Sequence, residues 1–234
     1  MPSIFVTGAG KGIGRAIAER YAAAGWDVAG VTRTAADVES LNRLDGAGTA
    51  RFWRADAAEA GEIAAVVAEY TRGGVGSGAG LDLLVNNAGA FRYGSFRDTE
   101  PATLEALWRN NVVSAFTVTR ALLPALIRAG GRIANIVSIA ALRPLPGKAA
   151  YSATKAAQAA LFRCLRDEIA DDGVTVTNIY PGLTYTSSFD GEDVDPATML
   201  SAADVAEAVF RNCAPHGNLA VEELVLQPAR GVRL

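Results

Sequence analysis

The segment that decides the fold reads SIFVTGAGKGIG and spans residues 3–14. Its apolar, β-branched start predicts a strand over residues 3–7, and the small and apolar residues after it predict a helix over residues 12–24. Glycines between the two let the backbone turn tightly, and the helix N-terminus offers amide groups to an anion. The spacing Gly8-x3-Gly12-x-Gly14 differs from the G-x-G-x-x-G dinucleotide fingerprint and lacks the ending of a nucleoside triphosphatase loop. Read alone, the segment indicates either a tight turn or a phosphate-binding turn, and its place after the first strand favours a dinucleotide.

Strand and helix patterns alternate in the same way along the rest of the chain. Short apolar runs are followed by longer amphipathic stretches about six times, which predicts parallel βαβ units with right-handed crossovers. The strands are largely apolar, so both faces of the sheet are expected to be covered. The sequence therefore predicts a single α/β domain over residues 1–234, a Rossmann-like doubly wound parallel sheet of about seven strands with helices on both faces. The expected strands cover residues 3–7, 27–32, 50–55, 81–86, 131–138, 175–180 and 223–226, and the expected helices cover residues 12–24, 57–71, 101–129, 149–172 and 202–213.

Two segments depart from this alternation. Residues 73–80 are rich in glycine and predict a flexible connector, to which we assign no function. Residues 189–196 contain Asp190, Glu192, Asp193 and Asp195 and predict an acidic loop. We expect this loop to belong to a variable substrate loop over residues 183–200, inside the same domain.

The composition argues against several classes of protein. Half of the 234 residues are hydrophobic and a fifth are charged, which is typical of a soluble globular protein. No apolar run reaches the roughly 18 residues of a membrane span, and no signal peptide precedes the first strand, so we expect a cytoplasmic protein without a membrane partner. A net charge of −3 gives no electrostatic reason to expect nucleic acid. Cys164 and Cys213 are expected to be buried, reduced thiols, and the spacing of these cysteines and of the single histidine, His216, predicts no metal site.

The end of the second predicted strand bears on the choice of coenzyme. An acidic residue at this place usually binds the ribose 2′-hydroxyl of NAD, whereas a nearby arginine suits the 2′-phosphate of NADP. Thr32 stands where the acid is expected and Arg33 follows it, while Lys11 lies in the glycine turn. Each cation alone is equally well explained as a solvated surface residue. Together they favour NADP(H) over NAD(H).

Tyr151 and Lys155 are the candidate proton-transfer pair. Their separation of four places both side chains on one face at the start of a predicted helix. A tyrosine has a pKa of about 10, and a neighbouring ammonium lowers that pKa toward the range useful for general acid–base catalysis. The pair alone is a common chance pattern on a helix surface. Ser138 strengthens it, because this residue ends the fifth predicted strand, where the ligand crevice of a parallel sheet lies.

These motifs in combination resemble the short-chain dehydrogenase/reductase family, and the resemblance covers nearly the whole chain. Residues 7–14 match its T-G-x3-G-x-G turn, and residues 86–89 match its N-N-A-G segment. Ser138, Tyr151 and Lys155 stand at the family spacing of the catalytic residues. Asn111 matches the fourth catalytic residue, although Asn110 stands beside it. Residues 181–186 match the P-G-x3-T segment, and Asp56 matches the acid that usually meets the adenine.

The resemblance implies a mechanism and a set of site residues. Tyr151 is expected to exchange a proton with the substrate oxygen as hydride passes to or from the nicotinamide. Lys155 is expected to lower the Tyr151 pKa and bind the nicotinamide ribose, Ser138 to polarise the carbonyl, and Asn111 to hold a water of the proton relay. No metal is expected. The expected coenzyme-binding residues are Gly8, Gly10, Lys11, Gly12, Ile13, Gly14, Arg33, Asp56, Asn87, Ala88, Gly89, Tyr151, Lys155, Pro181, Gly182, Thr184 and Thr186.

Two other classes of function are less well supported. A non-catalytic, dinucleotide-sensing regulator would be expected to lose the tyrosine or the lysine, yet all four catalytic positions are filled here. An epimerase or dehydratase acting on a nucleotide sugar generally needs a larger C-terminal substrate domain than the short segment after Pro181.

Within the family, a small free ketone, aldehyde or secondary alcohol is the favoured substrate. A 3-oxoacyl-[acyl-carrier-protein] reductase is the alternative, but Asp171, Asp172 and the acidic loop are expected to repel an acidic carrier protein. A homodimer through the two long helices, over residues 104–126 and 156–165, is also expected, and a homotetramer remains open. The residues expected to line an apolar substrate pocket are Leu142, Leu145, Leu183, Tyr185, Phe189 and Met199.

Overall fold

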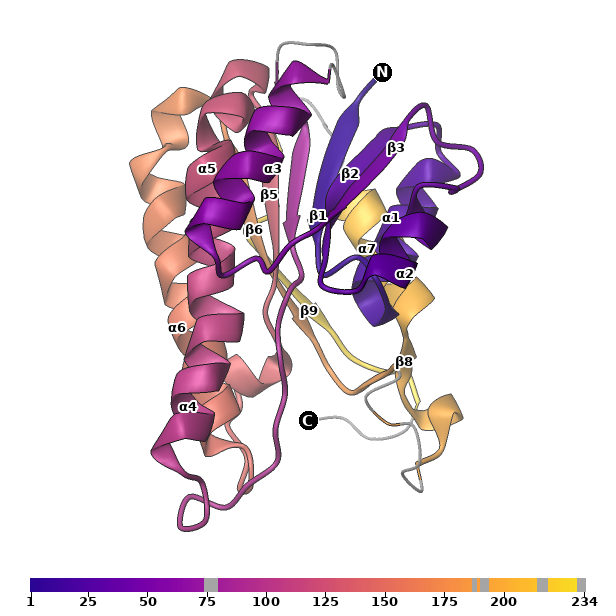
Figure 1. The fold of residues 1–234 in the computed structure, drawn as a ribbon. Helices are drawn as coiled ribbons and strands as arrows, with labels where there is room; N and C mark the ends of the chain where they lie inside the picture. The colour runs from indigo at the N-terminus through magenta and orange to yellow at the C-terminus, as the bar shows by residue number, and fades with distance from the viewer. Residues whose placement is uncertain (74–79, 187–188, 190–193, 214–218, 231–234) are drawn as a thin grey trace.

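The computed structural model in Figure 1 describes residues 1–73, 80–186, 189, 194–213 and 219–230 of the chain. Its centre is a seven-stranded sheet with strand order β3-β2-β1-β4-β5-β6-β9, in which all neighbouring strands run parallel. The strands are β1 (Ser3–Thr7), β2 (Asp27–Thr32), β3 (Ala50–Arg54), β4 (Leu83–Asn86), β5 (Arg132–Ile136), β6 (Thr175–Pro181) and β9 (Glu223–Leu226). The predicted single-domain, doubly wound α/β fold is confirmed.

Helices cover both faces of this sheet (Figure 1). One face carries α3 (Ala60–Arg72), α4 (Pro101–Trp108), α5 (Ser114–Ala129) and α6 (Ala149–Glu168), and the other carries α1 (Gly12–Ala22), α2 (Ala35–Leu41) and α7 (Ala202–Asn212). Successive residues of β1 enter different layers of the core, because Phe5 packs with the α3–α5–α6 side and Ile4 and Val6 pack with the α1–α7 side. Burial on both faces explains why the strands are uniformly apolar.

The strand order reverses between β1 and β4, and this reversal positions the site. From β1 the chain proceeds through β2 and β3 toward one edge, and from β4 it proceeds through β5 and β6 toward the other. The loops that leave the carboxyl ends of β1 and β4 therefore diverge and open a crevice between them. The glycine turn follows β1 and the Asn87-Ala88-Gly89 segment follows β4, so both motifs lie at this crevice.

Several local features differ from the sequence predictions. The helix α2 was not predicted, and neither was the small parallel pair of β7 (Thr184–Tyr185) with β8 (Leu200–Ser201). A π-helical turn, Arg109–Val113, interrupts the predicted helix between α4 and α5. The expectation that both cysteines are buried is wrong for Cys164, which lies on the exposed side of α6, and right for Cys213. Burial raises the pKa of the Cys213 thiol to about 11.

The helical stretch Pro101–Ala129 bears on the expectation that no segment spans a membrane. By length and composition it is apolar enough to cross a membrane, although no such segment was expected from the sequence. Core helices of globular proteins meet the same criterion, and this stretch packs its buried face against β4 and α3. Its apolar composition is accounted for in part by this packing.

Candidate active site

A cavity of about 560 Å³ opens at the carboxyl ends of the central strands. Its wall includes the glycine turn after β1, the end of β2, the loop after β4, the end of β5, the first turn of α6 and the segment after β6. This volume lies within the usual range of about 300–1,000 Å³ for ligand pockets. The predicted coenzyme-binding residues line this cavity with the exception of Gly14, and of the four predicted catalytic residues Ser138, Tyr151 and Lys155 line it.

The glycine turn and the loop after β4 hold each other in place. Gly8 and Gly12 have φ angles of 65° and 56°, which favour glycine. The Asn87 side chain donates to the carbonyls of Thr7 and Gly8 at 3.0 and 3.1 Å, and the backbone amides of Asn87 and Ala88 donate to Oγ1 of Thr7 at 3.0 and 2.9 Å. A Cβ at Gly14 would lie 2.3 Å from Nδ2 of Asn87, so Gly14 acts through close packing rather than on the cavity wall.

One end of the cavity carries the charges expected to bear on coenzyme choice. Lys11 and Arg33 both line it and are exposed, and Nη1 of Arg33 donates to Oδ1 of Asn110 at 3.5 Å. Asp56 also lines the cavity and accepts a hydrogen bond from Arg109 at 3.2 Å. A further acid, Asp37 of α2, lies on the same wall. Sequence reasoning missed this carboxylate because it did not predict α2.

The opposite end holds Ser138, Tyr151 and Lys155. Ser138 follows β5, and its Oγ accepts from the backbone N–H of Ala140 at 3.1 Å, which fixes the residue at the start of a short 3-10 turn. Tyr151 lies in the first turn of α6, and its phenol lines the cavity together with Ser138. The ring of Phe91 packs edge-on against that of Tyr151, with centroids 4.9 Å apart. The predicted serine and tyrosine therefore meet on the cavity wall.

Burial controls the titration of both reactive groups. It raises the pKa of the Tyr151 phenol, while the neighbouring Ser138 hydroxyl acts in the opposite direction. It lowers the pKa of the Lys155 ammonium to about 7. A net lowering of the Tyr151 pKa by Lys155 was expected, and the structure differs because the desolvation of the phenol dominates.

Lys155 is anchored by a chain of buried amides that the sequence analysis did not identify. Its Nζ donates to the carbonyl of Ile136 and to Oε1 of Gln158, both at 2.9 Å. Nε2 of Gln158 donates to Oδ1 of Asn135 at 2.6 Å, and the Asn135 amide donates to Asn178 at 2.8 Å. The three amide side chains are fully buried. Asn135 and Asn178 are polar residues inside otherwise apolar strands, and this pattern in the sequence could have marked them as members of a buried polar network.

Asn111 lies in the π-helical turn and joins two elements of the site. Its Nδ2 donates to the carbonyl of Ala90 at 3.0 Å and to Oγ1 of Thr154 at 2.9 Å, and the Ala90 amide donates back to Oδ1 at 2.7 Å. A Cβ at Gly89 would lie 2.9 Å from Oδ1 of Asn111 and 3.5 Å from Nζ of Lys155. Asn111 is therefore buried behind Gly89, next to Lys155, whereas Asn110 lines the cavity. Its role in holding a water remains a prediction.

The substrate end of the cavity is only partly as predicted. Leu145, Leu183 and Phe189 line it, whereas Leu142, Tyr185 and Met199 do not. Phe91, Tyr93 and Lys148 line it as well, and the sequence analysis missed all three. They come from the loop after β4 and from the residue before α6, and no periodic pattern marks such positions.

Asp171 and Asp172, which were expected to repel an acidic partner, do not lie at the cavity. Both follow the far end of α6, a helix of 20 residues that begins beside Tyr151 (Figure 1). At about 1.5 Å per residue such a helix is about 30 Å long, so these carboxylates are remote from the cavity. Asp190, Glu192 and Asp193 of the predicted acidic loop lie outside the described residues, as does His216. Within the described parts of the chain, no group of three or more His, Cys, Asp or Glu side chains is arranged to hold a metal.

A doubly wound sheet with a glycine turn at its switch point and a Ser–Tyr–Lys wall is the arrangement expected of a dinucleotide-dependent oxidoreductase. Comparison with known proteins specifies the family. The family model for short chain dehydrogenases matches residues 2–195, so the chain belongs to the short-chain dehydrogenase/reductase family and is an oxidoreductase. The sulfoacetaldehyde reductase of Chromohalobacter salexigens is 33% identical over 97% of this chain and 94% of its own length.

Solved structures show the same fold. An alcohol dehydrogenase from the archaeon Thermococcus sibiricus, complexed with 5-hydroxy-NADP, superposes with a TM-score of 0.89 over 100% of this chain and 99% of its own, at 24% identity. A protein described as a putative β-ketoacyl-ACP reductase superposes with a TM-score of 0.81 at 29% identity, over 97% of this chain and 96% of its own.

Proposed function

We propose that the protein transfers hydride between NADP(H) and a small ketone, aldehyde or secondary alcohol, with Tyr151 as general acid–base. The observation that carries this proposal is that Ser138 and Tyr151 lie together on the wall of the cavity that also contains the glycine turn. A carbonyl oxygen placed against this pair accepts two hydrogen bonds where negative charge develops. The proposed site is thus built to polarise and protonate a carbonyl.

The titration of Tyr151 suits the reductive direction. Because burial raises its pKa, the phenol carries its proton at neutral pH and is ready to donate it to the substrate oxygen. Lys155, held at the carbonyl of Ile136 and at Gln158, is the residue we assign to the nicotinamide ribose. Asn111 is assigned to the proton relay behind it. The bound coenzyme supplies or accepts the hydride itself.

The glycine turn fits the phosphates of a dinucleotide. The first turn of α1 has no side-chain cap at Lys11, so its amide groups are available to an anion at the cavity wall. Lys11 and Arg33 on the same wall support NADP(H) over NAD(H). The neighbouring alcohol dehydrogenase complexed with 5-hydroxy-NADP is consistent with this preference.

The test is a carbonyl and alcohol screen followed at the nicotinamide absorbance near 340 nm with both coenzymes. Turnover by the wild-type protein, with binding retained and turnover lost in Tyr151→Phe, is the expected result. Turnover that survives Tyr151→Phe contradicts the acid–base assignment. Coenzyme binding without turnover of any substrate class supports a dinucleotide-sensing regulator instead.

A 3-oxoacyl-[acyl-carrier-protein] reductase is the second candidate. The neighbour described as a putative β-ketoacyl-ACP reductase favours it, and the acidic pair that argued against it lies away from the cavity. Comparison of kcat/KM for acetoacetyl carrier protein and for an acetoacetyl thioester without the carrier separates the candidates. A clear preference for the carrier-bound form supports the second one.

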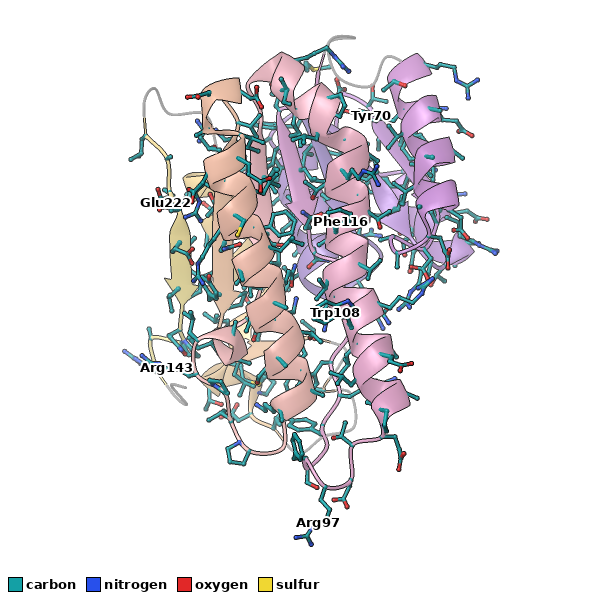
Figure 2. All side chains as sticks on the ribbon, turned by 90° about the vertical axis from the view of Figure 1, so that its left-hand side faces the viewer. Tyr70, Arg97, Trp108, Phe116, Arg143 and Glu222 are labelled. Carbon is teal, nitrogen blue, oxygen red and sulfur yellow. The ribbon has the colours of Figure 1, made fainter. Side chains whose placement is uncertain are left out.

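We also propose that the protein acts in the cytoplasm as a homodimer or homotetramer. Large apolar side chains are exposed on α4 and α5: Leu104 is 42% exposed, Trp108 47% and Phe116 48%. Figure 2 shows Trp108 and Phe116 along the helical stretch that faces the viewer, beside α6. Burial of such a stripe against a second copy follows the usual isologous arrangement of dimers.

A further inference from the structure

We propose that the substrate carries an anionic group in addition to its carbonyl, and that Lys148 binds this group. The inference rests on the proposed function and specifies its substrate class, a carbonyl compound with an apolar or aromatic body and a carboxylate or similar anion. Lys148 immediately precedes α6 and lines the cavity three residues before Tyr151. A cation at this place can contact the part of the substrate that extends beyond the Tyr151 phenol.

The ammonium of Lys148 lies on an aromatic wall. Its Nζ is 5.9 Å from the ring centroid of Phe91 and 5.4 Å from that of Tyr93, and the two rings meet edge to face at 4.5 Å. Phe91 in turn contacts Tyr151, with ring centroids 4.9 Å apart. One aromatic side chain, Phe91, therefore lies against both the cation and the proposed proton donor.

The backbone holds this wall in place. Gly94 pairs with Lys148 in a parallel bridge, and its amide donates to the carbonyl of Gly147 at 3.0 Å. The loop that carries Phe91 and Tyr93 is thus tied to the start of α6, which carries Lys148 and Tyr151. The relative position of the cation and the phenol is fixed by backbone hydrogen bonds.

The charge of Lys148 has no acidic counterpart on the described part of the cavity wall near it. The two carboxylates that line the cavity, Asp37 and Asp56, follow β2 and β3 at the coenzyme end. The ion pairs formed within the described residues do not include Lys148. Aromatic faces stabilise a cation, but they leave the N–H groups of the ammonium able to donate to an anion.

Besides Lys148 and the hydroxyl groups of Tyr93, Ser138 and Tyr151, apolar side chains line the substrate end. Leu145 and Leu183 line it together with Phe91. A single ammonium on a largely apolar wall orients a ligand, because an anion gains a charge-assisted hydrogen bond only in one pose. That pose directs the other end of the substrate toward Ser138 and Tyr151.

The test uses benzaldehydes with a carboxylate in the ortho, meta or para position, each paired with its uncharged methyl ester. Rates are compared for the wild type, Lys148→Met, Lys148→Arg and the control Arg92→Met. Methionine keeps the unbranched apolar stem of lysine and removes its charge. Arg92 is a matched control, because it lies on the same loop, is exposed and does not line the cavity.

In the wild type we expect kcat/KM for at least one carboxylate to exceed that for its ester by about tenfold or more, as for a hydrogen bond to a charged group. Lys148→Met should remove this preference through KM and leave the esters unaffected. Lys148→Arg should retain part of it, and Arg92→Met all of it.

The proposal is overturned if the wild type reduces carboxylates and esters equally, or if Lys148→Met slows both alike, which would show a packing role for the lysine. If no aldehyde in the set or in the wider screen is reduced, the proposed function itself fails. The two failures are therefore distinguishable.

Discussion

Replacement of Gln158 by methionine tests the buried amide chain behind the proposed active site. Methionine is close in length and volume to glutamine, so it preserves the packing while it removes both hydrogen bonds of the side chain. One of these is the acceptor for the Lys155 ammonium at 2.9 Å, and the other is the donor to Oδ1 of Asn135 at 2.6 Å. All of these groups are buried.

The size of the effect follows from these contacts. A hydrogen bond to a charged group contributes about 1.5–3 kcal/mol and a neutral one about 1 kcal/mol, and burial prevents water from replacing either. The gain from burying a more apolar side chain offsets about 1 kcal/mol. We therefore expect Gln158→Met to lower the free energy of unfolding by about 1.5–3 kcal/mol.

The assay is urea denaturation followed by circular dichroism at pH 6, below the Lys155 pKa of about 7. Gln158→Glu is the matched variant, because a carboxylate still accepts from Lys155 but places a second acceptor beside Oδ1 of Asn135, so it isolates the loss of the donor. A loss below about 0.5 kcal/mol in Gln158→Met, the level of a neutral surface substitution, would refute the reasoning.

Four further predictions follow from the site and its surroundings. Because burial raises the Tyr151 pKa, the rate of carbonyl reduction should stay level through neutral pH and decline only at alkaline pH. The rate of alcohol oxidation should rise with pH. A decline of the reduction rate centred near pH 7 would instead report the titration of the Lys155 ammonium. Arg33→Asp should shift the ratio of kcat/KM values from NADP(H) toward NAD(H), and an unchanged ratio removes Arg33 from the specificity argument. Gly14→Ala should lower stability by about 1–3 kcal/mol and weaken coenzyme binding, since its Cβ would lie 2.3 Å from the neighbouring amide nitrogen; thermal melts with and without coenzyme measure both. Trp108→Lys should shift the protein toward monomer in light scattering, and an unaltered mass contradicts the proposed interface.

The sequence alone predicted the architecture well, because periodicity and turn chemistry are local. All seven strands of the main sheet were placed near their observed positions, since each is a short apolar run next to a glycine-rich or polar turn. The helix α2 was missed because its seven residues carry little apolar pattern. The π-helical turn at Asn111 was missed because it changes the hydrogen-bonding register without changing the helical pattern.

Motif spacing also predicted most of the cavity wall. The glycine turn, the segment after β4 and the Ser138–Tyr151 pair were expected near one another, and they line one cavity. Their proximity follows from the rule that ligands bind at the carboxyl ends of parallel strands. Predicting it therefore required only that the sheet be doubly wound.

Long-range contacts were decided by the tertiary structure. Gln158 reaches Asn135 because α6 packs on β5, and Asn135 reaches Asn178 because β5 pairs with β6. Burial likewise raises the pKa of Tyr151. The sequence analysis had expected the neighbouring Lys155 ammonium to lower it.

The chain's sequence thus determined the order of its elements and the residues that carry the family motifs, because both depend on neighbours close in the chain. The tertiary structure decided that Lys148 faces the aromatic wall of Phe91 and Tyr93, that Asp37 lines the coenzyme end, and that Asp171 lies far from the cavity. The physical reason is that charge and burial depend on distances in space, which are set only when the helices and loops pack onto the sheet.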